Sequence, residues 1–202
     1  MSQKISLSPS MSGYFQEVVS EALRSRNLEA TDAASSYLVD LLCDYAHPNE
    51  QSGSTLTQPL TFLLRDALEA TGAERFQRLR GLGDGVLYVA GFFGGHIDSK
   101  GIHRGYIVSV GSTAYREAAA MLRRSPKVTG QGPDVLSELA DKFERFAQVL
   151  GDVADAALAS NARDPRAMLK LYERWLRTGS SRLAEELGAR GLIPTRGTGG
   201  LN

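Results

Sequence analysis

Two of the three histidines in the chain lie in one glycine-rich connection, together with a carboxylate. His96 and Asp98 form an H-x-D pair, and His103 follows five residues after the aspartate. Imidazole nitrogens and a carboxylate oxygen are ligands for zinc and related divalent ions, and histidine also transfers protons near neutral pH. A metal-binding loop normally supplies a further ligand, and no third histidine or cysteine lies nearby. The sequence therefore predicts no metal site, and it names no cofactor.

Aromatic side chains flank this connection on both sides, and glycines are dense within it. Because glycine weakens a regular element, such a concentration indicates either tight packing or a loop that admits a ligand or partner. Aromatic rings and histidines gathered by glycines suit a binding pocket, although the same rings also fill ordinary cores. The candidate binding residues are Tyr88, Phe92, Phe93, His96, Asp98, His103 and Tyr106.

Other patterns of possible chemistry are weaker. Cys43 precedes His47 by one helical turn, which is the spacing of a reactive thiol but also of an ordinary free cysteine. Gly81, Gly83 and Gly85 resemble a phosphate loop only in composition, because the segment before them has a helical pattern rather than a strand pattern. We interpret these glycines as sites of close backbone packing. Since no nucleophile elbow or zinc-protease motif is present, the sequence does not predict an enzyme.

One helix of the C-terminal region is expected to carry a row of cations at intervals of three or four residues: Arg166, Lys170, Arg174 and Arg177. Such a row suits a phosphate or an acidic partner, or forms a solvated face with intrahelical pairs to Glu173. The whole chain has 23 basic and 23 acidic residues and a formal net charge of zero. A dedicated nucleic-acid binder usually has a basic excess, so this function is not predicted.

Length and composition indicate one globular domain of 202 residues, 42% of them hydrophobic. We expect a flexible arm over 1–10, a single helical domain over 11–192 and a flexible tail over 193–202. A single cysteine excludes an internal disulfide and favours a reducing compartment. The chain begins without the apolar segment of a signal peptide, and no apolar run approaches membrane-spanning length. The expected location is cytoplasmic, with no membrane association.

Apolar stripes at helical spacing recur along most of the chain, and the longest runs from Ile107 to Leu122. Gly111 and Ala114 lie at its middle, where a neighbouring helix could approach closely. The stripes predict an all-α bundle of about seven or eight helices. Nine stripes are visible, the fourth and the ninth of them short, near 12–23, 34–45, 57–68, 76–79, 86–93, 107–122, 136–157, 168–176 and 183–187. We expect Asp84 to cap the fifth, Gly151 to be a soft point in the seventh, and Asp164–Pro165 to start and Gly179 to end the eighth. The alternative is a mostly helical fold with one β-hairpin in 86–110, since this segment is rich in β-branched and aromatic residues.

These observations favour a non-catalytic, soluble helical module that binds a protein partner in an adaptor or regulatory role. The absence of a catalytic motif and the small residues Gly111 and Ala114 support this hypothesis, and the partner is either another protein or a second copy of the chain. The alternative is a protein that binds a small molecule or cofactor in a pocket around 88–106.

Overall fold

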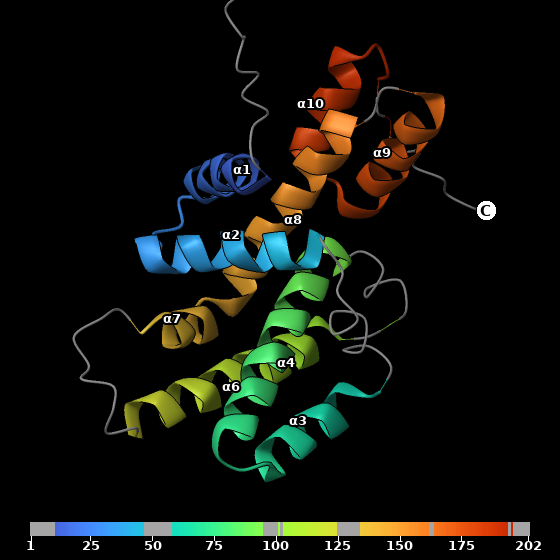
Figure 1. The fold of residues 1–202 in the computed structure, drawn as a ribbon. Helices are drawn as coiled ribbons and strands as arrows, with labels where there is room; N and C mark the ends of the chain where they lie inside the picture. Colours follow the sequence, from blue (N-terminus) through green and yellow to red (C-terminus); the bar gives the residue numbers. More distant parts are fainter. Residues whose placement is uncertain are drawn as a thin grey trace, which may run out of the picture.

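A computed structural model describes residues 11–46, 58–94, 101, 103–124, 134–161, 164–193 and 195 of the chain. These residues form nine helices and no strand (Figure 1). The helices are α1 (Met11–Ser25), α2 (Asp32–Ala46), α3 (Leu60–Glu69), α4 (Gly72–Phe92), α6 (Arg104–Arg124), α7 (Val135–Asp141), α8 (Phe143–Asn161), α9 (Pro165–Thr178) and α10 (Ser181–Ala189). The all-α prediction is confirmed. The hairpin alternative is not supported, because 86–92 and 104–110 are helical.

The long helix α8 runs through the molecule and connects its two apolar clusters (Figure 1). At one end, α4 and α6 lie side by side with α3 packed against them, while α1 and α2 pack over α8 and α7. These elements share the main apolar core. At its other end, α8 meets the pair α9 and α10, whose smaller cluster is built around Leu171, Trp175, Leu183 and Leu187. None of the helices in the described ranges is both long and apolar enough to span a membrane.

Two of the expected helix boundaries are wrong. The short helix near 76–79 and the helix after it are one continuous element, α4, and Asp84 lies inside that element rather than at a cap. Within α4, Gly83 permits the close approach of α6, because an added Cβ at Gly83 would lie only 2.7 Å from the Tyr115 ring. The long helix expected over 136–157 is broken at Lys142, which ends α7 and whose ammonium binds the Glu29 carbonyl at 2.8 Å. Helix α8 continues through Gly151.

The prediction of close packing at Gly111 is confirmed. An added Cβ there would overlap the ring of Phe143, which begins α8, and Ala114 is completely buried. A second close contact lies where α4 crosses α8: an added Cβ at Gly91 would stand 2.5 Å from the Cβ of Leu150. The small residues of α6 thus serve internal packing. They therefore do not support partner binding, contrary to the expectation from the sequence.

Helix α9 begins and ends where the sequence predicts. Asp164 caps α9 by accepting a hydrogen bond from the Ala167 amide at 2.7 Å, and Pro165 occupies the first turn, where its missing N–H costs nothing. Gly179 ends the helix in the left-handed conformation, with φ of 67°. Ser180 then caps α10 by accepting from the Leu183 amide.

We predict that Gly111→Leu destabilises the fold by about 1–3 kcal/mol, because the new side chain has to displace the Phe143 ring. The matched control is Gly81→Ala in α4, where an added Cβ meets nothing within 4 Å. That control should stabilise the protein by roughly 0.5–1 kcal/mol through the higher helix propensity of alanine. Urea denaturation measures both; equal stability of Gly111→Leu and wild type would contradict the packing described.

We also predict that Trp175→Ala destabilises the protein by roughly 3–5 kcal/mol, because the indole is only 6% exposed and lies in the C-terminal cluster. This is the only tryptophan in the chain, so its emission reports directly on the environment of α9. The wild-type protein should emit at a blue-shifted wavelength and resist iodide quenching. A water-like emission would show that the indole is exposed.

Candidate functional site

The glycine-rich connection is only partly described, since His96 and Asp98 lie outside the described residues. His103 is exposed at the start of α6, where its Nδ1 accepts a hydrogen bond from the Gly105 amide at 3.2 Å. This is a local contact of the kind that satisfies a free amide at a helix start. Among the described residues, no group of three His, Cys, Asp or Glu side chains is placed to hold a metal ion.

The aromatic candidates divide between two places. Tyr88 stacks between Tyr45 of α2 and Phe92, with ring centroids 4.3 and 4.6 Å apart, and Phe93 meets Tyr88 edge-on at 6.1 Å. Phe93 is 49% exposed, whereas the stacked rings are half-buried against the main core. Tyr106 contacts α3, where its hydroxyl accepts a hydrogen bond from an α3 amide. Three of the candidate aromatic residues therefore lie together at the end of α4, whereas the fourth, Tyr106, contacts α3.

The hydroxyl of Tyr106 accepts a hydrogen bond from the Thr61 amide at 3.1 Å and so satisfies one of the free amides in the first turn of α3.

Cys43 is half-buried against the main core. Burial raises the pKa of its thiol, and the charges of Asp40 and Asp44 raise it further. The thiol form is thereby favoured, which argues against the reactive thiolate that the spacing to His47 suggested. His47 itself lies outside the described residues.

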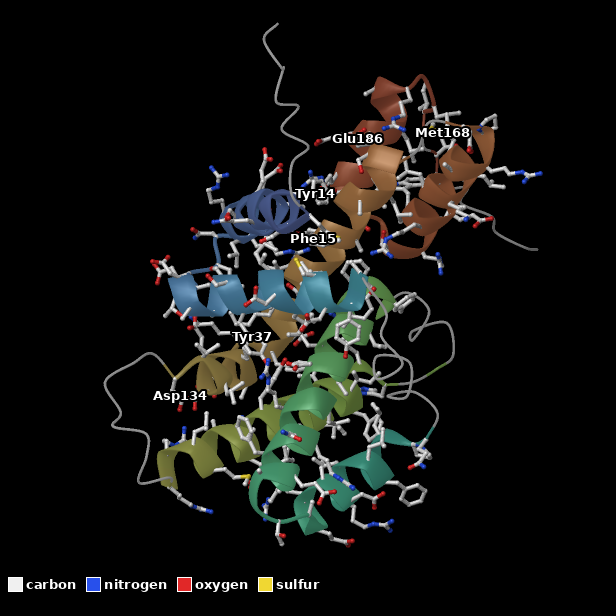
Figure 2. The ribbon with its side chains drawn as sticks, in the orientation of Figure 1. Tyr14, Phe15, Tyr37, Asp134, Met168 and Glu186 are labelled. Atoms are coloured by element: carbon white, nitrogen blue, oxygen red, sulfur yellow. The ribbon has the colours of Figure 1, made fainter. Side chains whose placement is uncertain are left out.

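An open groove of about 920 Å³ lies where α10 faces α1 across α8 (Figure 1). Residues of α1, α4, α6, α8, α9 and α10 line it, and its lining is rich in charged side chains of both signs. Small residues of α4 and α8, including Gly91 and Gly151, form part of its wall. Glu186 projects from the side of α10 that faces α1 (Figure 2). The charged lining residues are Glu21, Arg26, Arg104, Asp152, Asp155, Arg174, Arg177, Arg182, Glu185 and Glu186.

Arg174 is the most buried cation of this groove, and it joins three helices. Its Nε donates to the buried Asp155 of α8, Nη1 donates to the Phe92 carbonyl at 2.8 Å, and Nη2 donates to the Gly151 carbonyl at 3.3 Å. The Phe92 carbonyl belongs to the last turn of α4, where carbonyl groups lack helical partners. The interpretation of the cation row as a solvated face with intrahelical pairs is wrong for Arg174, because its guanidinium lies inside the groove wall.

The remaining arginines of the groove differ in how firmly they are held. Arg26 donates to both carboxylate oxygens of Asp152, with the Nη2 contact at 2.7 Å, and to Gln148 at 3.0 Å. At the rim, Arg182 lies 3.5 Å from Glu21 and Arg104 lies 3.3 Å from Glu144, and these pairs are more exposed. Exposed pairs contribute little to stability and exchange easily with other charges. The groove thus combines a fixed wall with a rim of available charges.

Within the described ranges, Arg177 makes no ion pair, and its Nε donates only to the Glu173 carbonyl at 3.4 Å. The hydroxyls of Thr178, Ser180 and Ser181 follow it along the same edge of the groove. Ser180 is engaged as the cap of α10, and Thr178 donates to the Arg174 carbonyl at 2.9 Å. This edge therefore offers one guanidinium and the exposed Ser181 for contacts with a bound molecule.

A second polar cluster, which sequence reasoning missed, is buried between α2, α4 and α6. Tyr37 projects from the side of α2 that faces α4 and α6 (Figure 2), and its hydroxyl donates to Asp84 at 2.6 Å. The buried Tyr115 of α6 donates to the same carboxylate oxygen at 2.7 Å. Arg80 donates to the Tyr37 hydroxyl at 2.9 Å and lies 3.6 Å from the carboxylate. The four side chains form a closed network that holds three helices together.

Burial determines the titration of this network. Removal from water raises the pKa of the Asp84 carboxyl, and the hydrogen bonds from Tyr37 and Tyr115 only partly oppose that effect. The pKa values of both tyrosines are raised, first by burial and then by the nearby carboxylate. The hydroxyls therefore remain donors, as the network requires. The only sequence signal for it was the spacing of Arg80 and Asp84, which is that of an intrahelical ion pair.

Comparison of the chain with known protein families, with curated proteins and with solved structures finds no match.

We predict that two substitutions of Asp84 differ in how strongly they destabilise the fold. Asp84→Ala should cost roughly 1–3 kcal/mol, because it leaves the buried hydroxyls without their acceptor. Asp84→Asn keeps an oxygen for both tyrosines and removes the buried charge, so it should be much less destabilising. Urea denaturation of both variants and wild type at neutral pH measures the difference.

The pH dependence follows from the raised pKa of Asp84. A carboxyl that binds its proton more tightly when folded adds stability below its unfolded pKa, and that contribution is lost as pH rises through the folded value. The stability of wild type relative to Asp84→Asn should therefore fall as pH rises through the acid range. A relative stability that increases with pH would contradict the raised pKa.

Proposed function

We propose that the protein is a non-catalytic binding module that takes a polypeptide segment of a protein partner in the groove between α1, α8 and α10. The observation that carries this proposal is the groove itself: it has a volume of about 920 Å³, is open to solvent, and is lined by residues of six helices that include charges of both signs. Partner segments bind in such grooves when the walls are preformed and the rim supplies polar contacts.

The preformed wall supports the proposal. Arg174 and Arg26 are each held by a carboxylate of α8 and by further acceptors, so binding a segment requires little ordering of these side chains. Arg104, Arg177 and Arg182 lie toward the rim with weaker contacts or none to a carboxylate in the described residues. These three guanidinium groups are available to carboxylates of a partner.

The charge balance of the groove favours a polypeptide over a polyanion. Its described lining includes five arginines and five carboxylates. A nucleic-acid site shows a basic excess, whereas a segment with both signs of charge finds complementary partners on both walls. The described lining residues include no histidine, cysteine, lysine or tyrosine, and both α8 carboxylates are engaged by arginines. This arrangement supports binding more than acid–base or nucleophilic chemistry.

A small molecule is the second candidate occupant. The groove includes Ala90, Gly91, Gly94 and Arg104, which belong to the segment around 88–106 where the sequence suggested a ligand pocket. Its volume is also within the range of small-molecule sites. The aromatic and histidine candidates are not among its described lining residues, so such a ligand would have to be recognised by charged and hydroxyl groups.

Photo-crosslinking tests the proposal. A photoreactive amino acid replaces Ser181 in the groove, and a matched variant carries it at Arg124, an exposed position at the end of α6. In cells that make the protein, we expect the Ser181 variant to capture a specific polypeptide that the Arg124 variant does not. Mass spectrometry identifies the captured segment, which is then made as a peptide for affinity measurement.

Arg182→Glu should weaken the affinity of that peptide by about tenfold, while Arg124→Glu should change it little. If neither crosslinking position captures a protein, the proposed function is wrong. A small molecule that copurifies with wild type and is lost from Arg182→Glu, in native mass spectrometry, would favour the second candidate instead.

A further inference from the structure

The outer side of α9 exposes two large apolar side chains. Leu169 is 57% exposed and Leu176 is 44% exposed, although both belong to an amphipathic helix. They are seven residues apart, so they lie on the same side of the helix, almost two turns from each other. Exposed leucines aligned in this way mark an interaction surface more often than isolated ones do.

Cations line one border of this pair. Arg166, Lys170 and Arg177 are exposed, and their spacing places them together along the side of α9 next to the leucines. In the described part of the chain none of the three takes part in an ion pair, while Glu173 is the one exposed carboxylate of the helix. The outer face, defined as Arg166, Leu169, Lys170, Glu173, Leu176 and Arg177, therefore carries a net positive charge beside an apolar strip.

The opposite side of α9 holds the face rigid. Leu171 and Trp175 are buried in the C-terminal cluster, and Arg174 is held by Asp155 and by carbonyls of α4 and α8. A docked helix would consequently meet a preorganised surface, which lowers the entropic cost of binding.

We propose that this outer face binds an acidic amphipathic helix of a protein partner. Such a helix places apolar residues on Leu169 and Leu176 and its carboxylates beside Arg166 and Lys170, in the helix-against-helix mode of recognition. A second copy of the chain fits less well. Two α9 helices laid antiparallel through these leucines bring the basic border of one copy near that of the other, and like charges oppose such contact.

The inference does not depend on the function proposed for the groove. Arg177 borders both surfaces, but Arg166, Leu169, Lys170 and Leu176 are not lining residues of the groove. The experiment below uses only these four, so its outcome and the crosslinking outcome are separate.

The test uses a fluorescein-labelled synthetic helix of about 18 residues, long enough to be partly helical alone, with leucines at i, i+3, i+4 and i+7 and glutamates beside them. Fluorescence anisotropy with the full chain measures its affinity. We expect saturable binding that weakens as salt rises, because part of the attraction is between exposed charges. A peptide of the same pattern with lysine in place of glutamate should bind at least about tenfold more weakly.

Variants locate the site. Leu169→Ser with Leu176→Ser should weaken binding by at least about tenfold, and so should Arg166→Glu with Lys170→Glu. Phe62→Ser on α3 is the matched control for the leucines, since it also removes an exposed apolar side chain, and Arg124→Glu is the control for charge. Unchanged Trp175 emission and melting temperature confirm that each variant is folded.

No saturable binding of the acidic peptide by the wild-type chain would overturn the proposal. So would equal affinity for the acidic and lysine peptides, or loss of binding in the control variants to the same extent as in the α9 variants. Self-association of the free chain that is abolished by the leucine substitutions, without peptide binding, would assign the face to a second copy.

Discussion

The close crossing of α4 on α8 is the constraint on which the rest of the structure depends. A side chain at Gly91 would collide with Leu150, so only glycine lets the two backbones approach at this point. The approach brings the end of α4 beside α8, and Arg174 of α9 binds the Phe92 and Gly151 carbonyls at that junction. One contact between backbones thus sets where the C-terminal pair attaches and where the groove opens.

The carboxylates of Asp84 and Asp155 are stabilised in different ways, and the difference matters for the proposed function. Asp84 accepts from two tyrosines inside the main core, and its pKa is raised by burial, so the network tolerates the neutral acid. Asp155 meets a guanidinium, which is charged at any relevant pH. The first network holds α2, α4 and α6 together, whereas the second fixes α9 against α8. The partner surfaces proposed for the groove and for α9 both rely on the second.

Three glycines of the central helices serve close packing. Gly83 accommodates the Tyr115 ring, Gly91 permits the α4 crossing, and Gly111 accommodates Phe143. Function is better sought on surfaces where charges are incompletely paired, because a carboxylate or guanidinium without a strong partner is available to another molecule.

The helices, their apolar faces and several caps could be predicted from the sequence, because these depend on neighbours within one or two turns. The stripe through Gly111, the Asp164–Pro165 start and the Gly179 stop are examples. The break at Lys142, the burial of Asp84 and the inward turn of Arg174 could not, because their partners are distant in the chain. A row of cations has the same spacing whether it faces water or a carboxylate on another helix. Only tertiary packing decides which cation is buried, since it alone brings Asp155 and two carbonyls within reach of one guanidinium.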